Sequence, residues 1–134
     1  MKFYQTAKAS MTIISRDVRN KARRIASSVH LVRTNSWATT YAVQGDHGLH
    51  IVSMRPGSPA YLTCDCPAGT TCSHRLAVLR YRAIQRGHTT IAFCHSQAHT
   101  RSFARALQAN RRFRDVRACR VQGIWMVEAN RFGE

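Results

Sequence analysis

One segment dominates the expected fold: Cys64-Asp65-Cys66-Pro67-Ala68-Gly69-Thr70-Thr71-Cys72-Ser73-His74. Its metal-binding residue types come in two pairs, Cys64 with Cys66 and Cys72 with His74, and one residue separates the members of each pair. Zn²⁺ prefers a tetrahedron of thiolate and imidazole ligands, and four protein ligands leave no position for water or substrate. The residues between the pairs include proline and glycine, which favour a sharp reversal. We therefore predict one structural zinc ion held by Cys64, Cys66, Cys72 and His74.

Regular structure is expected on both sides of this segment. Alternating apolar residues predict two strands within 36–55, joined by a turn at 45–48, and a second turn at 55–59 precedes a short third strand over 60–63. A helix is predicted over 73–86, with Ser73 as its N-cap and Gly87 just beyond its end. The segment is thus expected to form a β-β-β-zinc-α module.

The remaining residues predict further helices and strands around this module. Residues 15–29 read as a helix capped by Ser15, with Asp17 in its first turn and an apolar stripe along one face. The tail predicts a strand over 90–94, a helix over 100–112, and a hairpin of 116–121 and 124–128 turning at 122–123. The expected class is α+β, with three parts: an arm or strand (1–14), the zinc module with its preceding helix (15–87), and a β-α-β-β subdomain packed on it (88–134).

Three aromatic residues near the zinc segment allow two interpretations. Trp37, Tyr41 and Tyr61 could stack on nucleic-acid bases, as aromatic side chains do on single-strand platforms. For Trp37 and Tyr41 we favour the alternative, which is that they belong to the core of the sheet.

The charge balance points to a polyanionic partner. Lys and Arg total 21 against 6 Asp and Glu, a formal charge of +15 on 134 residues, and such an excess opposes compaction by self-repulsion. Of the cations 18 are arginine, whose guanidinium group fits phosphate oxygens and guanine edges. DNA is the favoured partner, with RNA as an alternative; an acidic protein or an anionic membrane surface fits less well.

The expected phosphate contacts fall into three groups. They are Arg75, Arg82 and Arg86, a stripe on the helix after His74; Arg111, Arg112 and Arg114 in the tail; and Arg16, Arg19 and Arg23 on the first helix, where a solvated face is an equally good interpretation. These arginines would neutralise phosphate charge and fix the position of the protein along the nucleic acid; they would not read the base sequence.

The cysteines indicate a reducing compartment. Five is an odd number, and three of them lie within nine positions, which is typical of metal binding and not of a disulfide framework. The chain start lacks the apolar core of a signal peptide, and no apolar run approaches the ~18 residues of a membrane span. We expect an intracellular protein with no membrane partner.

Catalysis is not expected. The carboxylates are scattered along the chain, so they predict no Mg²⁺ site, and the pattern of a zinc deaminase is missing. Cys94, His95, His99 and Cys119 could form a second metal site or a nucleophilic pair, but the adjacent Cys94 and His95 would point to opposite faces of a strand. We interpret them as core cysteines and surface histidines, and predict no small-molecule substrate.

The ligand spacing resembles the SWIM zinc-finger family, whose signature is Cys-x-Cys, a variable gap and Cys-x-His. Cys64, Cys66, Cys72 and His74 carry that signature here, and the resemblance extends over about residues 15–86. It implies a β-β-zinc-α module used for DNA binding or protein contact in chromatin remodellers, transposases and recombination factors. The gap of five residues is short for the family, and no ATPase or transposase domain accompanies the module.

Two functions follow from these observations. The first is a small, non-catalytic zinc protein that binds DNA or RNA through phosphate contacts, in recombination, transposition or transcription. The alternative is an adaptor whose zinc module docks a larger enzyme such as a recombinase, remodeller or polymerase.

Overall fold

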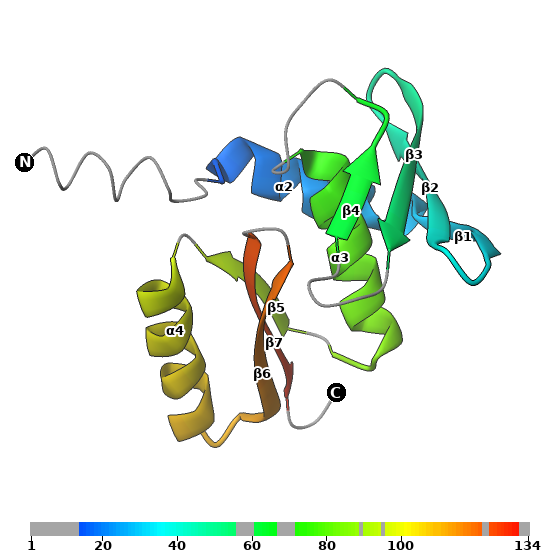
Figure 1. Ribbon diagram of the computed structural model, residues 1–134. Helices are drawn as coiled ribbons and strands as arrows, with labels where there is room; N and C mark the ends of the chain where they lie inside the picture. Colours follow the sequence, from blue (N-terminus) through cyan, green and yellow to red (C-terminus); the bar gives the residue numbers. More distant parts are fainter. Residues whose placement is uncertain are drawn as a thin grey trace, which may run out of the picture.

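The computed structural model describes residues 14–55, 61–66, 72–88, 90–94, 96–121 and 124–131. Within these ranges the chain forms two antiparallel sheets and three α-helices, which confirms the α+β class (Figure 1). The helices are α2 (Arg16–Ile25), α3 (Ser73–Gln85) and α4 (Gln97–Ala109). The strands are β1 (His30–Thr34), β2 (Thr39–Gly45), β3 (Gly48–Arg55), β4 (Tyr61–Cys64), β5 (Thr90–Cys94), β6 (Phe113–Val121) and β7 (Ile124–Arg131).

The first sheet has the strand order β1-β2-β3-β4. Its register places Tyr41 opposite Val52 and Val52 opposite Cys64, so the last residue of β4 lies on the face that carries the core. Strand β1 was not predicted from the sequence. Every residue of this edge strand is exposed, and the pairing with β2 shifts between Leu31 and Arg33, so the strand lacks the alternation by which we identified the others.

Helix α2 begins as predicted and ends earlier. The Ser15 side chain accepts a hydrogen bond from the Val18 amide at 3.2 Å, and Ala22 and Ile25 face the core. Residues 26–28 then tighten into a 3₁₀ turn rather than continuing the helix to position 29.

Helix α3 is buried over most of its surface and lies between the two sheets (Figure 1). Its N-cap is Cys72, not Ser73, because the cysteine sulfur accepts the Arg75 amide. Its C-terminus is a Schellman motif around Gly87, which has φ +89°: the Gly87 amide donates to Ile84 O and the His88 amide to Ala83 O.

The second sheet has the order β5-β7-β6, and α4 packs on one of its faces. Helix α4 begins three residues before the predicted position because Ser96 caps it by accepting the His99 amide at 3.1 Å. Strand β6 starts earlier than predicted as well, and its pairing with β7 is irregular between Arg114 and Arg117. Asp115 lies there with a left-handed φ of 55°.

One apolar core joins the two sheets. It contains Val52 and Leu62 of the first sheet, Leu76 of α3, and Phe93 and Met126 of the second sheet. Burying a side chain of this size stabilises a fold by about 1.5–3 kcal/mol. Residues before and after position 87 therefore depend on the same packing.

The expectation for the aromatic residues is confirmed for Tyr41, which is 4% exposed, and wrong for Trp37, which is 77% exposed. The Asn35 side-chain oxygen accepts the amides of Trp37 and Ala38 at 2.8 and 3.0 Å. These bonds form a turn between β1 and β2, which lifts Trp37 out of the strand on which we had placed it.

Several predictions fall outside the described residues. They concern the arm at 1–14 apart from Ile14, which is buried in the core, most of the turn at 55–59, the reversal at Pro67 and Gly69, the turn at 122–123, His95, and the side chain of Tyr61. Among the helices of the described ranges, none combines the length and apolar character needed to cross a membrane.

Candidate metal centre

The structure brings Cys64, Cys66, Cys72 and His74 together. One ligand atom from each lies within 4.8 Å of all the others. The end of β4 provides Cys64, the bend after it Cys66, and the N-cap and first turn of α3 the other two. Sulfur atoms bound to one tetrahedral zinc ion at ~2.3 Å are about 3.8 Å apart, so the cluster has the dimensions of a single metal site.

The orientation of His74 identifies its metal-facing nitrogen, which the sequence could not. Its Nδ1 is 3.8 Å from the Cys64 sulfur. Its Nε2 is buried on the other side of the ring, with no hydrogen-bond partner in the described residues. That side rests on Gly45, where an added Cβ would lie 2.7 Å from Nε2. Nδ1 is therefore the atom that would face a bound metal ion, and Gly45 makes room for the ring.

Residues beyond the four candidate ligands contact the His74 ring and Asp65, which lies between Cys64 and Cys66. The His50 ring stacks on His74 with centroids 3.9 Å apart and an interplanar angle of 29°. His50 Nδ1 lies 2.9 Å from an Asp65 carboxylate oxygen, whose partner oxygen accepts the Ile51 amide at 3.3 Å. The hydrogen bond from His50 lowers the pKa of Asp65. Such outer contacts orient metal ligands.

His50, Asp65 and Cys64 also converge closely enough to share an ion. Because Cys64 belongs to both groups, and because His50 and Asp65 already bind each other, we interpret this second group as support for the first.

The thiols favour one thiolate even without a metal. A hydrogen bond from Cys64 lowers the pKa of Cys72 to about 4, with help from the Arg75 amide at the start of α3. As the donor of this hydrogen bond, Cys64 keeps its proton, which raises the pKa of Cys64; burial of the Cys64 thiol raises it further. A thiolate at a helix N-terminus is stabilised by the amides there, so α3 prepares a ligand for the metal.

Arg75 belongs to the metal centre. It is 9% exposed, and its guanidinium donates to Leu62 O at 3.3 Å and to the Cys72 sulfur at 3.4 Å. Three thiolates, one neutral imidazole and a divalent ion would carry a net charge of −1, which a buried guanidinium offsets. A contact with a phosphate would require breaking these bonds.

The other two arginines of the predicted stripe on α3 also have partners inside the protein. Arg82 donates to the Tyr41 hydroxyl at 2.6 Å. Arg86 binds both carboxylate oxygens of Glu128, at 2.9 and 2.6 Å, and this hydrogen bonding raises the pKa of Arg86. Their proposed contact with nucleic acid stays a prediction, and the structure gives each a second role.

Glu128 has a structural role that was not predicted from the sequence. Its side chain in β7 is fully buried, and besides Arg86 it has His88 Nδ1 at 2.8 Å and the Arg117 guanidinium at 3.9 Å. A buried carboxylate is stable only when it is paired. The available signal was a lone glutamate inside the apolar run of residues 124–129.

The remaining predicted contact residues lie in two places. Arg111 and Arg112 form the exposed turn after α4, and Arg114 follows on β6, where it approaches Asp115 at 4.0 Å. Arg16, Arg19 and Arg23 share one helix, α2. Figure 1 shows α2 well apart from the turn between α4 and β6, so the structure does not bring these two groups together.

The second metal site that we weighed does not form among the described residues. Cys94 is buried against α4, His99 is exposed, and neither they nor Cys119 enters a group of converging ligands. Burial raises the pKa values of Cys94 and Cys119, which makes both poor nucleophiles.

The comparisons with known proteins returned no relative. No protein-family model matches the sequence, and neither the curated proteins nor the solved structures contain a match to this chain.

Proposed function

We propose that this chain is a non-catalytic, zinc-stabilised protein that binds nucleic acid, DNA first and RNA second, through its phosphates. The observation that carries the proposal is the way the fold uses its few carboxylates. Asp46 pairs with Lys21 and Arg24, Asp65 with His50, Asp115 with Arg114 and Asn130, and Glu128 with Arg86.

Among the described residues, these pairs leave several arginines without a carboxylate partner. Within the described ranges, Arg16, Arg23, Arg101, Arg105, Arg111 and Arg112 form no ion pair with a carboxylate. A polyphosphate partner provides the missing negative charge, and the release of its counterions drives the binding. The turn at Arg111 and Arg112 is the contact that we propose first, because both residues are exposed and adjacent. Arg75 is left out because it is buried beside the candidate metal ligands.

Zinc is the metal that best fits the site, and its role is structural. Three cysteines and one histidine around a single point form a closed tetrahedral donor set, as in structural zinc sites. The ligand pattern, Cys-x-Cys and Cys-x-His between a strand and a helix, supports the assignment to a module of the SWIM type. Elemental analysis of the purified chain should give one equivalent of zinc, and far less would contradict the assignment.

The nucleic-acid proposal is tested by the salt dependence of binding. We expect the affinity for a DNA duplex, measured by fluorescence anisotropy, to fall steeply between 50 and 200 mM salt (~10³-fold or more for six phosphate contacts). Arg112→Gln should reduce the slope of log K against log salt by about 0.9. The matched control is Arg33→Gln on the edge of the first sheet, which removes one exposed charge and should leave the slope unchanged. A flat salt response of the wild type would refute the proposal.

An exposed apolar edge favours the adaptor as a second candidate. Leu31 and Val32 on β1 are 52% and 55% exposed, and Trp37 stands in the adjacent turn. Unpaired edge strands accept strands from partner proteins, and exposed tryptophans are common anchors of interfaces. A partner that is captured by the wild type, resists nuclease and is lost with Trp37→Ser would support this function. Loss of every partner on nuclease treatment would exclude it.

A further inference from the structure

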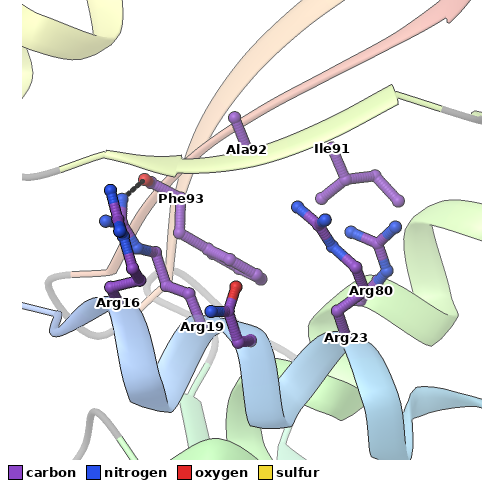
Figure 2. A pocket seen from close by; sticks show the side chains of 8 residues that line it. Arg16, Arg19, Arg23, Arg80, Ile91, Ala92 and Phe93 are labelled. Atoms are coloured by element: carbon purple, nitrogen blue, oxygen red, sulfur yellow. Dashed lines mark hydrogen bonds between the residues drawn. The ribbon is translucent and has the colours of Figure 1, made fainter.

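A cavity of about 240 Å³ lies where α2, α3 and β5 meet (Figure 2). Four arginines line it: Arg16, Arg19 and Arg23 from α2 and Arg80 from α3. Ile91 and Phe93 of β5 form an apolar wall. The sequence predicted that the arginines of α2 share one helix face. In the structure Arg80 of α3 lies opposite that face, and together they line a cavity.

Figure 2 shows the four guanidinium groups as two pairs. Arg16 and Arg19 lie together near the backbone of Phe93, and Arg23 and Arg80 lie together beside Ile91. Arg19 donates to Phe93 O at 3.5 Å, which ties the first pair to β5. Arg16 and Arg23 are seven residues apart on α2, which is about 10 Å along a helix axis. This separation can accommodate two linked anionic groups.

The electrostatics of the cavity are unfavourable until an anion enters it. No carboxylate is present among the described residues that line it. Arg80 is half-buried, and burial, followed by the positive charge of Arg23, lowers the pKa of Arg80. Arginine guanidinium groups bind phosphate through charge-assisted, often bidentate hydrogen bonds, and a partly desolvated cluster of them favours the entry of such an anion.

We propose that this cavity binds a phosphate or diphosphate group of a nucleotide. Ligand pockets for whole drug-sized molecules are about 300–1,000 Å³, so this smaller space takes only the phosphate portion and leaves the rest of the ligand outside. The phosphate can belong to a free nucleotide or to the end of a nucleic-acid strand, since both present the same chemistry. The inference goes beyond the proposed function, because it requires neither the turn at Arg111 and Arg112 nor a long polyanion.

Binding of inorganic pyrophosphate to the zinc-loaded full chain, measured by titration calorimetry at 150 mM salt, tests the proposal. Arg23→Gln and Arg80→Gln should each weaken binding about tenfold or more, because each removes charge-assisted hydrogen bonds. The matched control is Arg105→Gln, which removes the same charge from the exposed face of α4 and should have no such effect. Because Arg80 has no carboxylate partner among the described residues, Arg80→Gln should also keep or raise the melting temperature.

Two further arms identify the source of the phosphate. If a short DNA strand with a 5′-phosphate binds about tenfold tighter than the same strand with a 5′-hydroxyl, and Arg80→Gln removes the preference, the ligand is a strand end. If a nucleoside diphosphate competes with pyrophosphate and the two strands bind equally, the ligand is a free nucleotide. Either result supports the site.

The proposal fails if pyrophosphate shows no saturable binding to the wild type, or if Arg105→Gln weakens it as much as Arg23→Gln. Should Arg80→Gln be unfolded, Arg23→Gln on the exposed helix still decides the question. Salt-dependent binding of duplex DNA that persists alongside a negative pyrophosphate result would leave the proposed function intact and refute this site alone.

Discussion

The two ends of α3 are fastened to the two sheets by different chemistry. At its N-terminus, Cys72 and His74 converge with Cys64 and Cys66 beside the first sheet. At its C-terminus, Arg86 binds the buried Glu128 of the second sheet, and His88 Nδ1 lies 2.8 Å from the same carboxylate. The first attachment would draw its strength from an ion taken from solution, and the second needs only residues of the chain.

The stability of the first attachment thus depends on the metal concentration, and that of the second does not. A metal-ligand cluster loses its stabilisation when the ion is removed or the ligands are protonated, because the bound form requires thiolates. A buried ion pair gives modest net stability, but loss of one partner strands a charge in the core. The first sheet should therefore respond directly to metal supply, and the second sheet should respond only through the core that the two share.

The largest effect is expected at the metal end. Cys66→Ser, or chelation of the wild type, should unfold the module around residues 60–86, because structural zinc contributes about 10 kcal/mol or more in comparable peptides. Circular dichroism and hydrogen exchange should show loss of protection in β3, β4 and the start of α3. Cys119→Ala, outside the cluster, should keep one equivalent of metal. A Cys66→Ser protein with the wild-type melting temperature and no metal would contradict the structural role of the ion.

Glu128→Gln should have the next largest effect, at the other end of α3. We expect a loss of about 2–3 kcal/mol in the free energy of unfolding, less than for a fully buried pair because the Arg86 side chain is 33% exposed. Denaturant titration in the presence of zinc measures it. The decisive comparison is with chelator present: if the Glu128→Gln loss appears only in the metal-loaded protein, the two attachments are coupled rather than independent.

Gly45→Ala should affect the metal centre without touching a ligand. The new methyl would lie 2.7 Å from His74 Nε2, so the ring must move and its Nδ1 with it. We expect zinc affinity, measured by competition with a chelating dye, to fall about 10–100-fold, as with other outer contacts of metal ligands. Unchanged affinity would show that the ring has more room than the structure indicates.

Asp46→Asn should have the smallest effect on stability. It removes the exposed ion pairs between Asp46, in the turn after β2, and Lys21 and Arg24 of α2. Hydrogen bonding to Arg24 lowers the pKa of Asp46, so its contribution to stability is present above the carboxyl's unfolded value, ~3.9, and is lost as pH falls through the lowered folded value. The variant should melt slightly below the wild type at pH 7, and the two should converge in acid. Because acid also releases metal, only the difference between the two proteins at each pH is informative. A difference that grows below pH 4 would contradict the assignment.

The local signals in the sequence were sufficient for one end of α3 and insufficient for the other. The four candidate ligands lie within eleven residues, so their spacing alone predicts one site, and their convergence is confirmed. Glu128 and Arg86 are 42 residues apart, and nothing local distinguishes this pair from a scattered acid and a surface base. Pairs of this kind arise only when two sheets pack against one helix.

The smaller errors have more local causes. A helix cap is chosen by geometry as well as propensity: Cys72, held by the cluster, occupies the N-cap for which Ser73 was the better candidate by type. Strand β1 was missed because an edge strand needs no apolar alternation, and Trp37 was misplaced because the side chain of Asn35 bends the chain before it.

The two tryptophans report on different halves of the molecule. Trp37 is open to water beside the first sheet, whereas Trp125 on β7 is partly buried with the Arg120 guanidinium 5.0 Å from its ring centre. Emission from Trp37 should already be red-shifted in the native state and should shift to the blue only when another molecule covers it. Unfolding of the second sheet should move the Trp125 band to the red. Intrinsic fluorescence of the unmodified chain can thus distinguish docking from denaturation.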